Sequence, residues 1–325
     1  MKRLAYLGGA VGILLVLVLS VRTDFGAIRH AFESAGLGLA WLIPYRLLFY
    51  LLYAIGWKVL LRPSDPLGRV SLRYLFGVTV VRDAVDRLLP VASVGGSLVG
   101  IRLVQWRGLA TAPVAASVVI EIIITLVVVY IFTAMGLVVL AQLGAGAQEY
   151  RRALLVFLCT LPVPIITVLL LRSRRFAEAI PEKMAALFGA DSAIGKTAAV
   201  AQEVRAALHR PAAFSVASLL QLLAFISGAF EVWFALRLFG APVSPVVALM
   251  LECMTQAARH LAFFVPAGIG VQEVGLVAFG HLAGVGGELA FAVAMVKRAR
   301  ELAWGIPALL AWQWAELRRS RAASN

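Results

Sequence analysis

The stretch FFVPAGIGVQEVGL, residues 263–276, interrupts an apolar segment with one proline, three glycines and one glutamate. Proline and glycine disfavour helix, and a non-helical turn leaves backbone N–H and C=O groups unpaired. In hydrocarbon such a turn persists only where protein, water or a ligand satisfies these groups. We therefore expect the break to line a cavity, with Glu273 in the first turn of a helix that restarts near Val271.

The composition around this stretch is typical of a polytopic membrane protein. The 325 residues are 62% hydrophobic and 14% charged, with a mean hydropathy of +0.91, whereas soluble domains carry about 25% charged residues. The net charge of +13 comes largely from residues that flank apolar runs. This pattern favours anchoring at anionic lipid headgroups over nucleic-acid binding. Cys159 and Cys253 lie in apolar segments without disulfide or metal-ligand spacing.

Six segments are long and apolar enough to cross a bilayer. They cover residues 4–21, 37–61, 112–143, 153–171, 212–239 and 301–317. We expect the last one to begin before residue 301. Two other apolar segments, 70–108 and 246–287, are broken by proline and glycine and must each enter and leave on one side. The sequence predicts an all-α polytopic membrane protein with about six transmembrane helices and two re-entrant hairpins.

Basic loops set the expected orientation. Lys and Arg gather at both termini and in two connecting loops, while two other loops carry no charge, which places both termini in the cytoplasm. The whole chain is expected to be one integral membrane domain. Its expected parts are a first repeat half at 37–143, a linking helix with a cytoplasmic amphipathic connector at 144–211, and a second repeat half at 212–317.

An internal repeat supports this division. An offset of 176 positions aligns Trp57 with Trp233, Pro66 with Pro242, Thr79 with Thr255, Pro90 with Pro266, Gly108 with Gly284, Ser97 with Glu273 and Glu121 with Lys297. Because an odd number of predicted crossings separates the halves, the repeat would be inverted in the membrane. Paired Pro/Gly-broken segments in corresponding positions indicate a transporter with a binding site near the bilayer midplane.

Candidate site residues lie at and beside the two breaks. The expected structural residues of the hairpin tips are Pro90, Gly95, Gly96, Ser97, Pro266, Gly268 and Gly270. Charges at this depth usually face a bundle interior or an aqueous cavity, so we expect substrate binding or coupling from thirteen polar side chains. These are Arg82, Asp83, Asp86, Arg87, Glu121, Glu252, Arg259, His260, Glu273, Lys297, Arg298, Arg300 and Glu301.

Simpler roles for these residues remain open. Neutralisation between residues four apart on a helix accounts for Arg82 with Asp86, Asp83 with Arg87 and Lys297 with Glu301. Glu273 is either a partner of the helix dipole or a group linked to substrate or protons.

Depth along the helices predicts one specific ion pair. Glu121 and Lys297 each lie ~15 Å into their helices from opposite surfaces, about half the hydrocarbon thickness. A lone charge at the midplane is costly, so we expect these two side chains to pair across the repeat interface.

The same residues carry a family resemblance. LLPVASVGGS at 88–97, RHLAFFVPAGIGVQE at 259–273 and KRAREL at 297–302 resemble the transmembrane region of lysylphosphatidylglycerol synthases and related flippase-like membrane proteins. ECMTQAARHLAFFVPAGIGVQE with KRARELAWGIPALLAWQ is most similar to the hopanoid-associated HpnL branch. The resemblance implies movement of a lipid or lipid-linked headgroup between leaflets of the bacterial cytoplasmic membrane, with membrane lipids as partners.

Two features depart from that family's pattern. Relatives commonly carry an acid where this chain has Ser97, so a symmetric pair of carboxylates is not assumed. The sequence ends at Asn325, without the soluble aminoacyl-transferase domain of the synthases, so lipid synthesis is not expected.

Enzyme motifs are weak or lacking in the sequence. ADSAIGKT at 190–197 matches a relaxed P-loop pattern, but no strand precedes it and the connector is too short for a nucleotide-binding domain. There is no HExxH or GxSxG motif, and the four histidines lack ligand spacing. We expect no enzyme activity, cofactor, metal, nucleotide or nucleic acid. The alternatives are a non-transporting scaffold for lipid-biosynthesis enzymes and a membrane-embedded lipid transferase.

Overall fold

The computed structural model describes residues 25–89, 95–142, 147–163, 166, 169, 193–263 and 265–324. The predicted crossing at 4–21, the tip residue Pro90 and the first part of the connector lie outside the described residues. Within them every regular element is a helix, which confirms the predicted all-α class.

The described residues form a series of α-helices and short 3-10 helices (η). They are α2 (Phe25–Ala35), η1 (Gly36–Trp41), α3 (Leu42–Leu61), η2 (Arg62–Ser64), α4 (Leu72–Leu88), α5 (Gly95–Gln105), α6 (Thr111–Gln142), α7 (Ala147–Thr160), α10 (Ala193–Leu208), α11 (Pro211–Leu238), α12 (Pro245–Leu261), η3 (Pro266–Gly268), α13 (Val271–Leu282) and α14 (Gly287–Ser324).

Three described stretches are long and apolar enough to span a membrane. They are Ile28–Ser64, Thr111–Gln142 and Pro211–Leu238. The helix that contains the predicted last crossing begins earlier than residue 301, because α14 is continuous for 38 residues from Gly287. The other expected crossings and the re-entrant character of the hairpins stay predictions.

Two pairs of corresponding helices in the two halves begin 176 positions apart. α5 and α13 begin at Gly95 and Val271, and α6 and α14 begin at Thr111 and Gly287. The turns before α6 and α14 contain Gly108 and Gly284, with φ angles of 79° and 75°. Glycine adopts this left-handed conformation without steric cost. The order of long helix, hairpin and long helix thus occurs twice, once in α3 to α6 and once in α11 to α14.

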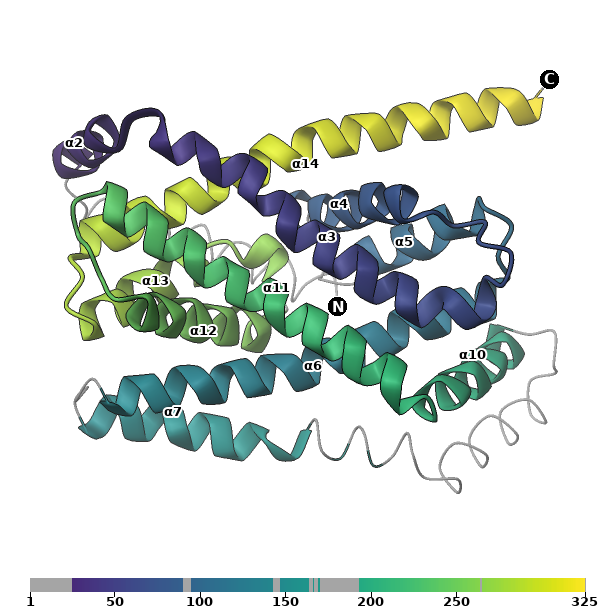
Figure 1. Ribbon diagram of the computed structural model, residues 1–325, viewed down its shortest axis with the longest axis horizontal. Helices are drawn as coiled ribbons and strands as arrows, with labels where there is room; N and C mark the ends of the chain where they lie inside the picture. The colour runs from purple at the N-terminus through teal and green to yellow at the C-terminus, as the bar shows by residue number, and fades with distance from the viewer. Residues whose placement is uncertain are drawn as a thin grey trace.

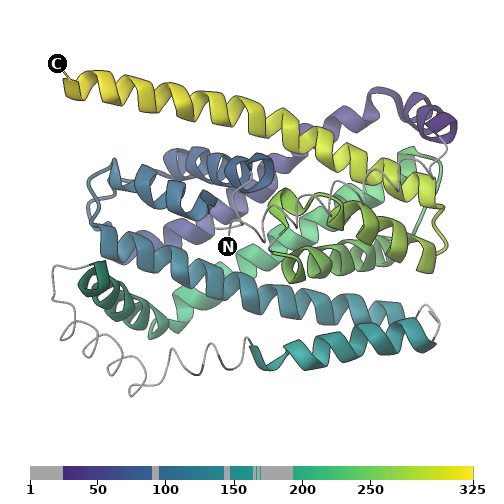
Figure 2. The same cartoon turned by 180° about the vertical axis from the view of Figure 1, so that it is seen from behind.

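The two hairpins lie at opposite ends of the molecule. α3 and α11 run side by side in opposite directions, with the α4–α5 hairpin toward one end and the α12–α13 hairpin toward the other (Figure 1). The break of the second hairpin lies against the first hairpin, because η3 contacts α4. α14 packs along both α13 and α4, which is also visible from behind (Figure 2).

Small residues permit close contacts between the helices. A Cβ on Gly136 of α6 would lie 2.6 Å from Cys253 Cβ, and one on Gly305 of α14 would lie 2.4 Å from Leu88 Cδ1. Small residues at helix contacts are typical of membrane bundles, where close packing replaces the hydrophobic effect as a driving force. Large apolar side chains such as Ile122, Val138 and Leu310 are 50%, 58% and 66% exposed, as expected for surfaces that face lipid.

Candidate functional site

The break at residues 265–270 is held by side chains. Ala267, Gly268 and Gly270 have φ angles of 56°, 59° and 81°, so the backbone leaves the helical conformation here. Arg298 of α14 donates from Nη1 to the carbonyl oxygen of Ala267 at 3.1 Å and from Nη2 to that of Gly268 at 3.0 Å. Glu273 Oε2 accepts the backbone N–H of Gly270 at 2.7 Å. Protein groups therefore satisfy two carbonyl oxygens and one N–H of the broken backbone.

Glu273 has a clear structural role. Its side chain is buried, and its second carboxylate oxygen accepts from Arg298 Nε at 2.7 Å. An acid at this position also complements the positive N-terminal end of α13. Of its two predicted roles, the structure gives the helix-terminus partner directly. A role linked to substrate or protons stays a hypothesis.

In the first hairpin too, a carboxylate accepts a backbone N–H at the start of the second helix, but the acid comes from a different position. Ser97 occupies the position that corresponds to Glu273, and Asp86 of α4 instead accepts the backbone N–H of Gly96 at 2.8 Å. A Cβ on Gly96 would lie 2.3 Å from the carbonyl oxygen of Arg82, so only glycine allows this approach. The predicted Arg82–Asp86 pair is wrong because Arg82 turns to Glu121 and Asp86 to this N–H.

Glu301 of α14 connects the two hairpins. It accepts from Arg87 of α4 at 2.6 Å and from Arg298 at 2.9 Å. Nitrogens of Arg259 of α12 and of Arg300 lie 3.7 Å and 4.0 Å from the same carboxylate. The predicted pair of Glu301 with the lysine four residues earlier is not formed. Four arginines from three helices converge on one buried acid.

Two further charges were missed from the sequence. Arg46 of α3 lies 3.7 Å from Asp83 and 3.9 Å from Glu231 of α11, and Glu231 also pairs with Arg300. The Arg46 guanidinium is 3.6 Å from the centroid of the Phe49 ring. Each missed residue is a charge in the interior of a long apolar run, a signal that could have found both.

Each half also contains an ion pair between its hairpin and its long helix. Arg82 of α4 donates to Glu121 of α6 at 2.8 Å, and Lys297 of α14 donates to Glu252 of α12. The predicted pair between Glu121 and Lys297 is therefore wrong in this structure, because each finds its partner on the hairpin of its own half. In the first half the hairpin supplies the base and the long helix supplies the acid, whereas in the second half the hairpin supplies the acid and the long helix supplies the base. Gln256 also donates to Glu252, at 2.8 Å.

All of these charged side chains together form what we call the central charge cluster. All of these side chains are buried or half-buried, and their formal charges sum to zero. The seven bases are Arg46, Arg82, Arg87, Arg259, Lys297, Arg298 and Arg300, and the seven acids are Asp83, Asp86, Glu121, Glu231, Glu252, Glu273 and Glu301.

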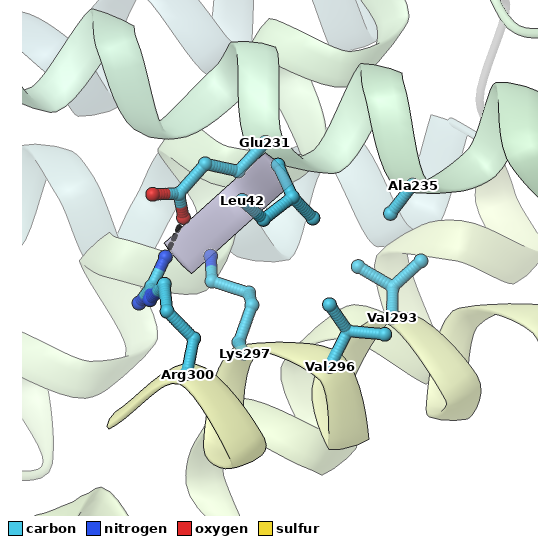
Figure 3. A pocket seen from close by; sticks show the side chains of 7 residues that line it. All are labelled: Leu42, Glu231, Ala235, Val293, Val296, Lys297 and Arg300. Atoms are coloured by element: carbon cyan, nitrogen blue, oxygen red, sulfur yellow. Dashed lines mark ion pairs between the residues drawn. The ribbon is translucent and has the colours of Figure 1, made fainter. Parts of the chain in front are cut away.

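Beside the cluster lies a narrow seam between α3, α11 and α14, which is too tight to admit a water molecule (Figure 3). Glu231 and Arg300 point toward one another at its charged end, and Lys297 enters from the same helix as Arg300. Its walls are Leu42, Glu231, Ala235, Val293, Val296, Lys297 and Arg300. One end is thus charged and the other apolar.

Comparison with known proteins identifies the family. The family model described as the lysylphosphatidylglycerol synthase TM region matches residues 6–308. The chain belongs to the lysylphosphatidylglycerol synthase transmembrane-region family. No curated protein and no solved structure gives a significant match. The match confirms the predicted resemblance at the level of the family, and with it a multi-pass membrane protein, while the HpnL branch stays a prediction.

The family match includes every member of the central charge cluster, because it ends within α14 after Glu301. His260, which we expected at the site, lies outside the cluster. Its side chain is exposed, with Nδ1 2.8 Å from the carbonyl oxygen of Gln256 and its ring 5.9 Å from that of Phe225. In the part of the chain that the structure describes, no group of His, Cys, Asp and Glu is placed to hold a metal ion.

Proposed function

We propose that this member of the lysylphosphatidylglycerol synthase transmembrane-region family moves a lipid, or a lipid-linked headgroup, between the two leaflets. The observation that carries the proposal is the central charge cluster, at the point where two hairpins from opposite ends of the molecule meet. Apolar residues of similar volume often stabilise a protein as well as buried ion pairs do. Fourteen charges at this depth are instead typical of a pathway for polar groups.

The repeated helix order supports alternating access. We propose that the halves are inverted in the membrane, so that each hairpin enters from a different face. The headgroup would pass between the hairpin tips while the acyl or polycyclic part stays in the bilayer. In the described arrangement the tips are bridged by Arg87 and Glu301, which corresponds to an occluded state of this mechanism.

An anionic headgroup would enter by competing for the arginines around Glu301. Arg259 is the best placed, because its shortest ion pair, 3.7 Å to Glu301, is longer than a hydrogen bond. Its remaining contact is a neutral one, from Nη1 to Gln272 Oε1 at 2.7 Å. Arg298 is the most exposed base of those around Glu301, at 19%. A phosphate that binds Arg259 and Arg298 would therefore loosen the contacts between the two tips.

The substrate class rests on the resemblance to the HpnL branch. It favours a hopanoid-related lipid, or an anionic lipid or glycolipid, in the bacterial inner membrane. Cytoplasmic termini and association with lipid-biosynthesis enzymes belong to the same proposal, and no nucleotide is required.

Reconstitution tests the function. Full-length protein is placed in liposomes that contain phosphatidylglycerol with a fluorescent label on its acyl chain, and dithionite is added outside to bleach the outer leaflet. Transport predicts bleaching of label from both leaflets, and mass spectrometry should show the lipid chemically unchanged. Label that stays protected would favour the scaffold, and a lipid of altered mass would favour the transferase.

A further inference from the structure

A second cleft lies apart from the central charge cluster, between η2, the start of α6 and α10. It has about 750 Å³ of space, including its opening to solvent. Apolar and polar residues both line it: Leu60, Ala116 and Ile120 are among the apolar ones, and Glu203 and Arg210 are among the polar ones. The cleft therefore offers an apolar surface beside two opposite charges.

Glu203 and Arg210 are both exposed. Neither side chain makes an ion pair with another residue in the described ranges. Glu203 lies on α10, and Arg210 lies in the turn between α10 and α11. An acid and a base that do not neutralise each other, at the edge of an apolar cleft, complement an amphiphile that carries both charges. Arginine suits phosphate, and a carboxylate suits an ammonium group.

We propose that this cleft binds the headgroup of a zwitterionic, amine-bearing phospholipid. Arg210 would contact the phosphate and Glu203 the ammonium, while the apolar walls contact the glycerol and the first acyl carbons. A lipid with a phosphate but no amine would leave the Glu203 carboxylate beside a like charge, so it should bind more weakly.

One layer of side chains separates the cleft from the central charge cluster. Ser117 lines the cleft and accepts a hydrogen bond from Trp57 Nε1 at 3.0 Å. The ring of the buried Trp57 lies 4.5 Å from the guanidinium of Arg82, which pairs with Glu121. Trp57 thus stands between the cleft and the cluster. Binding in the cleft is argued from its own lining residues and does not rest on the proposed function.

Binding can be measured without transport. Full-length protein in detergent is titrated with dioleoyl phosphatidylethanolamine, and separately with dioleoyl phosphatidylglycerol, and bound lipid is counted by native mass spectrometry. Ala206→Trp fills the cleft, because Ala206 lines it. Gln202→Trp, one turn earlier on the exposed face of α10, is the matched control.

We expect phosphatidylethanolamine to bind at least about tenfold more tightly than phosphatidylglycerol. Ala206→Trp should weaken this binding about tenfold, and Gln202→Trp should leave it within about twofold. If Ala206→Trp does not fold, two variants at exposed positions replace it. Glu203→Gln should reduce the preference for phosphatidylethanolamine, and Arg210→Gln should weaken the binding of both lipids, since both carry the phosphate. Equal binding by the two tryptophan variants, or equal affinity for the two lipids, would overturn the proposal.

The outcomes separate this inference from the proposed function. Binding that depends on the cleft in a protein that moves no lipid would remove the transport proposal and leave the binding site. Lipid movement that is unaffected by Ala206→Trp, in a protein that does not prefer phosphatidylethanolamine, would remove the binding site and leave the transport proposal.

Discussion

Arg87 of α4 and Glu301 of α14 are 214 residues apart in the chain and are joined by a 2.6 Å ion pair. The pair fastens the first hairpin to the helix that also holds the break of the second, since Arg298 of α14 contacts both Glu301 and the tip carbonyls. Movement of one hairpin relative to the other therefore requires this pair to open.

Glu301→Gln should destabilise the protein strongly. The change leaves the surrounding arginines with one acid fewer, and removal of one partner from a buried ion pair costs about 3–5 kcal/mol in soluble proteins. We expect a clear fall in the unfolding midpoint measured by thermal denaturation in detergent. Glu316→Gln is the control, because Glu316 pairs with the largely exposed Arg102, and such surface pairs contribute at most about 1 kcal/mol. Similar midpoints for the two variants would contradict the role of Glu301.

Charge reversals should reveal the true partners of Lys297. Lys297→Glu combined with Glu252→Lys should recover folding and lipid movement that each single reversal loses, because the two side chains pair in the structure. Glu121→Lys with Lys297→Glu should not recover them. A double-mutant cycle on unfolding midpoints is expected to give coupling of about 0.5–3 kcal/mol for the first combination. Recovery by the second combination alone would show that Lys297 pairs with Glu121, as predicted from depth, and not with Glu252.

Gly96→Ala should disturb the first hairpin. The new Cβ would lie 2.3 Å from the carbonyl oxygen of Arg82, and such overpacking costs about 1–3 kcal/mol. Gly77→Ala on α4 is the control, since its Cβ would meet nothing within 4 Å and alanine favours helix by up to about 1 kcal/mol. The unfolding midpoint should fall for the first variant and hold or rise for the second, and the opposite order would show that this close approach does not form.

Residues with unusual backbone preferences, glycine and proline, allowed part of the fold to be predicted. Gly108 and Gly284 sit at matched left-handed turns, and proline and glycine mark both hairpins, so the repeat register could be read from residue type. Arg46 and Glu231 lie in the interiors of α3 and α11, where neither proline nor glycine of the repeat marks a position.

The partners in the cluster could not be predicted, for a geometric reason. Depth along a helix predicts how far a side chain lies from the surface, and it does not predict which way the side chain faces. Glu121 and Lys297 were paired on depth alone, yet they face different hairpins. The cap of α5 escaped prediction because Asp86 reaches Gly96 only through a close helix approach between residues ten positions apart.

Opposite labelling of the two ends would support the inverted arrangement. In a Cys159→Ser background, which removes the exposed native cysteine, Ser64→Cys should react with an impermeant maleimide only from the cytoplasm. Ala241→Cys should react only from the other side, because the α11–α12 turn lies toward the opposite end of the molecule from η2 (Figure 1). Labelling of both from one side would contradict the inversion.

The central claim is that the arginines around Glu301 carry a lipid headgroup across the membrane. Its most direct test compares the rate of fluorescent phosphatidylglycerol movement in liposomes for the wild type, Arg259→Gln and Arg318→Gln. Arg318 is exposed and lies near the end of α14, with its guanidinium 3.5 Å from the Trp314 ring centroid, so it controls for a lost positive charge. We predict that Arg259→Gln slows movement at least about tenfold and that Arg318→Gln matches the wild type. Equal rates for Arg259→Gln and the wild type, or no movement by the wild type, would contradict the claim.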